Sequence, residues 1–159
     1  MIDNNNLRLT VCQGLEEYLG IPIIRSGQNA KPPDYPYLSY TVTTLESANN
    51  GTWGKYKDSI DRIPVTQTWS ITVQSDKEEE SISLAIKARE YLDHMGTRYL
   101  NDNDVIVQSV TNITNRDNLI TIDYEYRNGF DAVFYMFDEA ENPIEKIGVI
   151  EAITLNKKE

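Results

Sequence analysis

The chain has 159 residues and a mass of 18.2 kDa, which is the size of one ordinary domain with its own core. Its 40% hydrophobic and 25% charged residues exclude both a membrane-embedded chain and a disordered tail. With 25 acidic and 15 basic residues the formal charge is −10, which argues against a protein that binds nucleic acid tightly. The charge is compatible with a negatively charged surface along which DNA moves without binding.

The cysteine content and the N-terminus bear on the compartment. Cys12 is the only cysteine, so no disulfide can form within the chain, and we expect its thiol to pack in the core. The N-terminus lacks a basic segment followed by an apolar one, and no apolar run approaches the 18 or so residues that span a bilayer. We therefore expect a soluble protein, intracellular when made, with no membrane contact.

The first half of the chain predicts a helix followed by strands. Apolar residues recur every four positions from about 5 to 19, and Gly20 is a natural helix end. A short extended piece follows at 21–25, and then an irregular region before a strand that begins at Tyr37. After a turn at 49–51, residues 65–74 alternate between apolar and polar side chains, as in an antiparallel strand with one buried face.

The second half predicts one more helix and then strands. Ser75 and Glu78 have capping-box spacing, and a helix is expected from there either to about Met95 or for one more turn through 98–100. Its predicted core stripe contains Ile82, Ala85, Ile86, Arg89 and Leu92. Alternating patterns then predict strands over 105–114 and 119–137, with a bulge or bend at Gly129, and a last strand candidate over 145–155.

These elements follow the order α-β-β-α-β-β-β. The pattern predicts an α+β fold in which two helices pack on one face of a mostly antiparallel or mixed sheet. No repeat or linker divides the chain, so we expect a single domain over 1–159. Its segment 138–159 is expected to be a C-terminal β extension that could serve assembly.

The residues that catalysis would need are scarce. His94 is the single histidine, and no nucleophile elbow or glycine-rich phosphate loop is present. One histidine and one cysteine cannot form a tetrahedral zinc site. We expect no enzyme, no metal and no cofactor, although the many carboxylates leave an oxygen-ligated Mg²⁺ or Ca²⁺ site open as an alternative.

The aromatic content suggests contact surfaces instead. Ten tyrosines and two tryptophans stand against three phenylalanines, and Tyr and Trp suit interfaces because they combine apolar area with a polar tip. Several of them lie in or beside irregular segments, where they either close the ends of the core or contact neighbouring subunits. Arg116 and Asp117 are expected either at an interface or as a local structural pair. The interface candidates are Tyr37, Trp53, Tyr56, Arg116, Asp117 and Arg127.

Three segments together resemble a known family. They are residues 33–40 (PDYPYLSY), residues 74–92 with QSD at their start, and residues 115–131, in which an Asn-Arg-Asp turn precedes a strand ending in Arg-x-Gly-Phe-Asp. In order and spacing they look like the tail-terminator, or neck, proteins of tailed bacteriophages that infect Gram-positive hosts. The resemblance covers roughly residues 5–137.

This resemblance implies a structural virion protein of the tail and neck, assembled in the host cytoplasm. Its members form a ring, which is a hexamer in this family, cap the tail tube, end its polymerisation and join the tail to the head connector. The implied partners are further copies of the chain, the tail tube protein and the head-closure or connector protein. DNA would pass through the lumen without specific binding.

Two other functions fit part of the sequence. A head-closure or adaptor protein of the neck would also form rings but would meet the portal side. A metal-dependent hydrolase or nuclease has only the abundance of Asp and Glu in its favour.

Overall fold

A computed structural model describes residues 2–47, 51–117 and 124–143. Part of the predicted turn at 49–51, the start of the predicted strand 119–137 and all of the candidate strand 145–155 lie outside these residues. The proposed extension 138–159 is therefore described only as far as 143. No helix among the described residues is long and apolar enough to cross a membrane.

The first helix, α1 (Asn4–Leu19), begins and ends where its sequence predicts. The Asp3 carboxylate accepts the Asn6 backbone N–H at 2.9 Å, which satisfies one of the otherwise unpaired donors of the first turn. Gly20 has φ +68° and donates its N–H to the Glu16 carbonyl, so a left-handed residue ends the helix.

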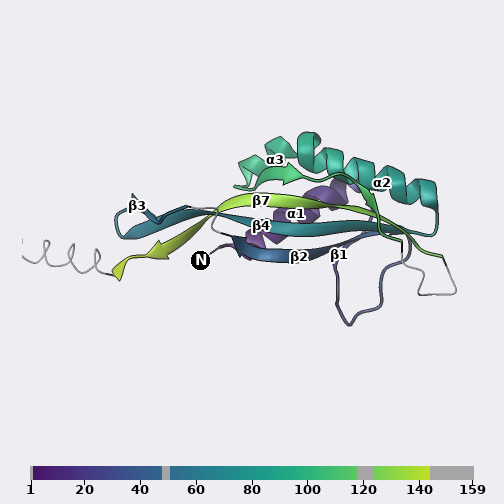
Figure 1. Ribbon diagram of the computed structural model, residues 1–159, viewed down its shortest axis with the longest axis horizontal. Coiled ribbons are helices and arrows are strands. Elements are labelled where there is room, and N and C mark those ends of the chain that lie inside the picture. The colour runs from purple at the N-terminus through teal and green to yellow at the C-terminus, as the bar shows by residue number, and fades with distance from the viewer. Residues whose placement is uncertain (1, 48–50, 118–123, 144–159) are drawn as a thin grey trace, which may run out of the picture.

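The described strands form one mixed, seven-stranded sheet. Its central order is β1-β2-β4-β7-β5, with β3 added to β4 and β6 added to β7; only β1 and β2 pair in parallel among these strands (Figure 1). The bounds are β1 (Ile23–Arg25), β2 (Tyr37–Ser47), β3 (Gly54–Lys57), β4 (Ile60–Ser75), β5 (Ile106–Val110), β6 (Thr114–Asn115) and β7 (Tyr126–Glu141). The predicted α+β class is confirmed. The strand β3 was not predicted.

The two long strands β4 and β7 organise the molecule. They pair without a register shift from Ile60 opposite Glu141 to Ser75 opposite Tyr126. At about 3.4 Å per residue this ladder is about 50 Å long, so it runs out beyond the helices (Figure 1). The predicted bulge at Gly129 is wrong, because Gly129 lies opposite Thr72 inside this unbroken ladder.

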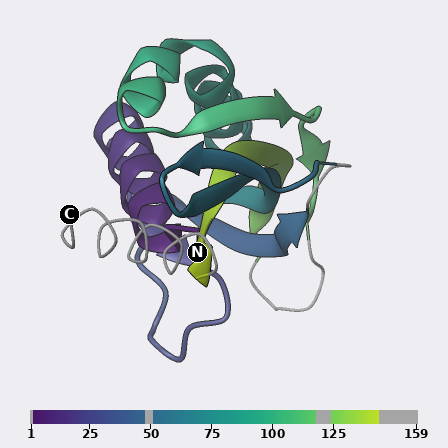
Figure 2. The same cartoon turned by 90° about the vertical axis from the view of Figure 1, so that its left-hand side faces the viewer.

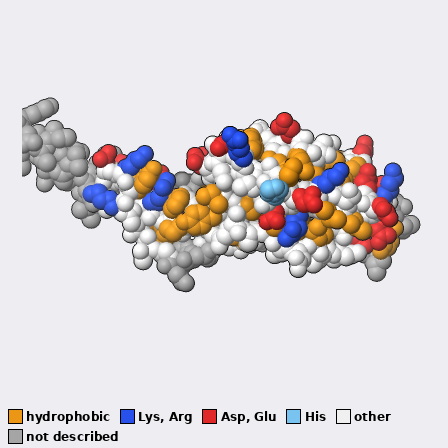
Figure 3. Space-filling view, turned by 90° about the horizontal axis from the view of Figure 1, so that it is seen from above, with side chains coloured by type: hydrophobic (Ala, Val, Ile, Leu, Met, Phe, Trp, Pro, Cys, Tyr) orange, Lys and Arg blue, Asp and Glu red, His pale blue; other side chains and the backbone are white. Residues whose placement is uncertain are grey.

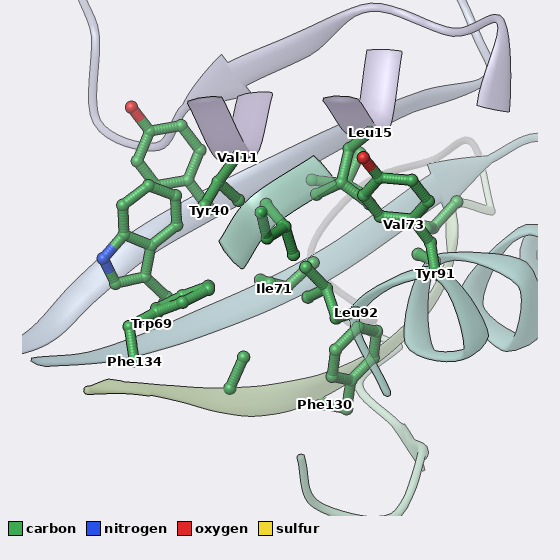
Figure 4. Packing of buried hydrophobic residues seen from close by; sticks show 14 of the residues in the cluster. Val11, Leu15, Tyr40, Trp69, Ile71, Val73, Tyr91, Leu92, Phe130 and Phe134 are labelled. Atoms are coloured by element: carbon green, nitrogen blue, oxygen red, sulfur yellow. The ribbon is translucent and has the colours of Figure 1, made fainter. Parts of the chain in front are cut away.

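One face of the sheet carries the core, and α1 lies on it together with α2 (Glu78–Glu90) and the segment that follows α2 (Figures 1 and 2). The predicted alternation in β4 is confirmed: Trp69, Ile71 and Val73 are buried, and they meet Val11 and Leu15 of α1 (Figure 4). The opposite face of the sheet carries mainly hydroxyl, amide and charged side chains.

The second helical segment differs from its prediction in three ways. The further turn at 98–100 is present, but α2 reaches it through an unpredicted π-helical turn, η1 (Tyr91–Met95), and the turn belongs to a third helix, α3 (Thr97–Asp102). Gly96 lies between η1 and α3 against the Tyr91 ring, where a Cβ atom would come within 2.4 Å of the ring carbon Cζ. Its predicted capping box is also wrong, because Ser75 bonds Glu80 at 2.6 Å instead of Glu78.

The third difference concerns which face of α2 is buried. The core side is made by Ser81, Ala85 and Ala88, followed by Leu92 in η1, and all four are buried. Ile82 and Ile86, which the predicted stripe included, are 40% and 43% exposed. Small residues on the inner side let the helix lie close to the sheet. The residues of the buried stripe are therefore smaller and less hydrophobic than the two isoleucines of the exposed stripe.

Cys12 lies at the margin of the core, as predicted for a packed thiol. Burial raises its pKa from an ordinary 9.0 to about 11. At pH 8 this lowers the thiolate fraction about a hundredfold, and only the thiolate reacts with alkylating reagents. We therefore expect iodoacetamide to modify the native protein at least about a hundred times more slowly than the urea-unfolded chain at pH 8. Equal rates, followed by mass spectrometry, would contradict this placement.

Candidate assembly surfaces

The predicted interface residues fall into two groups at opposite ends of the long ladder. Arg62 lies opposite Glu139 near one end, and Gln74 lies opposite Arg127 near the other, 12 residues away along β4. That separation is about 40 Å. Trp53 and Tyr56 lie at the first end, whereas Tyr37, Arg116, Asp117 and Arg127 lie at the second.

The first end is an arm, formed by β3, residues 60–64 of β4 and residues 137–141 of β7 (Figure 1). Asp58, with φ +38°, and Ser59 form the turn that joins β3 to β4. Tyr56, predicted in a loop, is part of β3 and is 41% exposed. Trp53 precedes the strand and is 49% exposed.

Arg62 organises one side of the arm. Its guanidinium carbon lies 3.7 Å from the centre of the Tyr56 ring and 4.1 Å from that of Phe137. Its Nε and Nη2 atoms also donate to one Glu139 carboxylate oxygen, at 3.1 and 2.9 Å. A cation between two aromatic rings restrains all three side chains, although each contact at an exposed site contributes only about 0.5–1 kcal/mol. The side chains on this side of the arm therefore have restrained positions.

At the second end, Arg116 is a cross-link between strands. Its Nη1 donates to Ser70 Oγ at 2.7 Å and Thr72 Oγ1 at 3.1 Å, and its Nη2 pairs with Asp131 at 3.1 Å. Gly129 makes room for this group, because a Cβ there would lie 3.0 Å from Nη1. Arg116 therefore pairs with Asp131 and not with its neighbour Asp117.

Asp117 and Arg127 close the same end of the sheet. The Asp117 carboxylate accepts the backbone N–H of Arg127 at 2.6 Å, and the Arg127 side chain pairs with Glu125 at 2.6 Å. Glu125 also accepts the Tyr35 hydroxyl at 2.7 Å, and this bond raises the pKa of Tyr35 to about 12. These side chains have partners within the chain. Their contact with another subunit remains a prediction.

Tyr37 has little surface to offer. It begins β2, is 7% exposed, and its ring stacks on Tyr35 with 5.7 Å between centroids. Burial raises the pKa of its hydroxyl. Its pairing with Gln74 places Tyr37 on the sheet face opposite the core, and Tyr35 beside it is the exposed member of the pair at 44%.

Two surface features were missed at the sequence level. One is the exposed stripe of α2, where Ile82 and Ile86 line a shallow groove of about 480 Å³ together with Glu79, Ser83, Lys87 and Glu90. The other is Phe137, which is 40% exposed on the arm. The sequence assigned Ile82 and Ile86 to the core because apolar residues with i, i+4 spacing are expected on the buried face of a helix. The spacing alone does not distinguish a buried stripe from an exposed one.

The described residues contain no group of three or more His, Cys, Asp or Glu side chains placed to hold a metal ion. His94, in η1, is exposed. The described residues therefore present surfaces suited to contact with other proteins.

A search of curated proteins finds no match for the chain. Among the solved structures that match, one has 14% sequence identity and a TM-score of 0.41, with 85% of this chain and 96% of the other covered. The profile of one protein family, described as phage neck terminator protein, matches residues 10–158, which is nearly the whole chain. The chain therefore belongs to the phage neck terminator protein family.

Proposed function

We propose that copies of this chain form a closed ring that caps the tail tube, ends tube polymerisation and joins the tail to the head connector. The family match over residues 10–158 carries this proposal. As a member of that family the chain is a structural component of the virion neck, which interacts with tail and head components. The ring, with six copies expected, and the two partners that it joins are the finer part of the proposal.

The shape of the subunit supports a ring. A closed ring is built from heterologous contacts, in which one patch of each subunit meets a different patch of the next. The chain has an arm at one end and a grooved helix elsewhere, so two unlike surfaces are available. Termination would then be geometric: one ring face matches the last tube ring, and the other does not accept a further tube subunit.

The proposed ring needs no catalysis, and its lumen needs no specific DNA contacts. The charge of −10 suits a bore through which DNA passes, because carboxylates repel phosphates. A charge map of the assembled ring checks this part separately. A basic bore with the acidic groups outside would contradict it.

The whole proposal is tested by electron microscopy of phage particles made without this protein. We expect tails of uncontrolled length that are not attached to filled heads, because nothing stops the tube and nothing joins it to the connector. Supplying the protein in trans should restore normal particles. Normal-length tails without heads would assign the protein to head closure instead, and intact particles would refute a neck function.

A further inference from the structure

We infer that the arm of one copy binds the groove on α2 of the next copy, and that this pairing is the repeating contact of the proposed ring. The inference rests on the ring proposed above and names its two surfaces. The arm surface is β3 with Trp53 before it. The helix surface consists of Glu79, Ile82, Ser83, Ile86, Lys87 and Glu90.

Both surfaces carry apolar side chains that are about half exposed. On the helix, Ile82 and Ile86 stand one turn apart at 40% and 43% exposure. On the arm, Trp53 and Tyr56 are 49% and 41% exposed. Covering such groups is favourable by about 25 cal/mol for each Å² of apolar surface removed from water. Trp and Tyr are also the residue types most often found at the centre of a protein interface.

The net charges of the two surfaces have opposite signs, because β3 carries two lysines, whereas the helix surface carries two glutamates and one lysine. Strand β3 contributes Lys55 and Lys57, both exposed, in a chain with a net charge of −10. The helix begins with three glutamates, Glu78 to Glu80, and Glu90 lies at its other end. Figure 3 shows basic, apolar and also acidic side chains on the arm, and a larger group of acidic side chains at the far end of the molecule. Two copies aligned arm to helix would bring opposite charges together.

The dimensions also agree. Four residues of extended strand span about 13 Å, and the helix between Glu79 and Glu90 spans about 16 Å. The two surfaces belong to different elements, β3 and α2, so a contact between two copies leaves the helix surface of one copy and the arm surface of the other unused. Such a contact is heterologous and extends from copy to copy until the ring closes.

The test uses two variants of the full chain, each with one surface damaged. The arm variant carries Trp53→Glu and Lys57→Glu, and the helix variant carries Ile82→Lys and Ile86→Lys. All four positions are exposed, so both variants should keep the circular dichroism spectrum of the unmodified chain and should unfold in a single cooperative transition. Matched controls are Lys31→Glu in the loop before β2 and Leu9→Lys on α1, which are also exposed but lie outside both surfaces.

Light scattering after gel filtration gives the result. The unmodified chain and both controls should form the ring, and each damaged variant alone should be a monomer of about 18.2 kDa. An equimolar mixture of the two damaged variants should give a dimer of about twice that mass, because one intact arm meets one intact helix and growth stops there. If either damaged variant still forms rings, or if two folded monomeric variants do not pair when mixed, the inference is wrong.

A second measurement applies if rings form only on tails. In particles that carry Trp53→Cys and Ile86→Cys in one chain, oxidation should link neighbouring copies into a ladder of covalent oligomers, whereas each single cysteine variant should give none. Incorporation of the double variant without any ladder overturns the arm-to-helix contact while leaving the neck function intact. Absence of the unmodified protein from the neck would instead refute the proposed function. Damaged variants that form rings but lose the tube or the head would assign that surface to another partner.

Discussion

Replacing Trp69 by alanine is expected to lower the free energy of unfolding by about 3–5 kcal/mol, as for other large aromatic residues in a core. Trp69 is 2% exposed. Its ring stacks on Tyr40 at 4.5 Å between centroids and meets Phe134 edge-on at 5.1 Å (Figure 4). Alanine would leave a cavity at the point where β2, β4 and β7 share one aromatic cluster, and the rigid sheet cannot collapse to fill it.

The Trp69 indole also satisfies a buried polar group. Its Nε1–H donates to Gln67 Oε1 at 2.7 Å, and Gln67, which is 3% exposed, donates in turn to Asn4 Oδ1 and to the Leu45 carbonyl, both at 2.9 Å. Removing the indole also leaves the buried Gln67 oxygen without this donor, and an unsatisfied buried polar group is itself unfavourable. This is why the loss should lie toward the upper part of the range.

Trp53→Ala is the matched control, because it removes the same side chain from a site that is 49% exposed. Its effect on stability should stay within about 0.5 kcal/mol. Urea unfolding followed by circular dichroism measures both variants through the shift of the midpoint at constant slope. Similar losses for the two tryptophans would mean that Trp69 does not lie at the centre of the core.

Replacing Gly129 by alanine is expected to destabilise the protein by about 3 kcal/mol or more, at the upper end of what overpacking costs. The added Cβ would lie 2.3 Å from the Ile71 carbonyl oxygen and 2.8 Å from Thr72 Oγ1. The first is backbone in the middle of the β4–β7 ladder, so relief requires the two strands to move apart. Arg116, 3.0 Å from the same point, would also lose its fit to Ser70 and Thr72.

The control for this variant is Gly54→Ala on β3, where no atom lies within 4 Å of the added Cβ. Here alanine should be neutral or stabilising by up to about 1 kcal/mol, because glycine in a strand loses more backbone entropy on folding. Gly129→Ala is thus expected to be destabilising, whereas Gly54→Ala is not. Thermal unfolding decides between them, and equal melting temperatures for both variants would show that Gly129 has no close neighbour.

These two positions show how far the amino-acid sequence predicts this protein. The alternation from 65 to 74 already assigns Trp69 to the buried face, because a strand has a period of two residues. The sequence also shows a glycine at 129 within a strand, but it does not show why glycine is required at that position. A bulge was the local explanation, whereas the actual one is the approach of Ile71 and Arg116, which come from 58 and 13 residues earlier in the chain.

The assembly surfaces divide in the same way. Trp53 and Tyr56 could be identified as aromatic residues outside a regular core stripe, although not as exposed ones. The arm that presents them could not, because β3 is defined only by its pairing with residues 60–62 of β4. For α2, the sequence contains two apolar stripes, and only the packed sheet selects Ala85 and Ala88 for the inside and leaves Ile82 and Ile86 outside.

Local periodicity, capping residues and composition determined the α+β class, the start and end of α1, the buried face of β4 and the acidic character of the chain. These depend on interactions within a few residues, which the order of amino acids specifies directly. Only the tertiary structure decided the arm, the partners of Arg116 and the exposed face of α2. Each of these depends on strands and helices far apart in the chain meeting in one register, which no local pattern encodes.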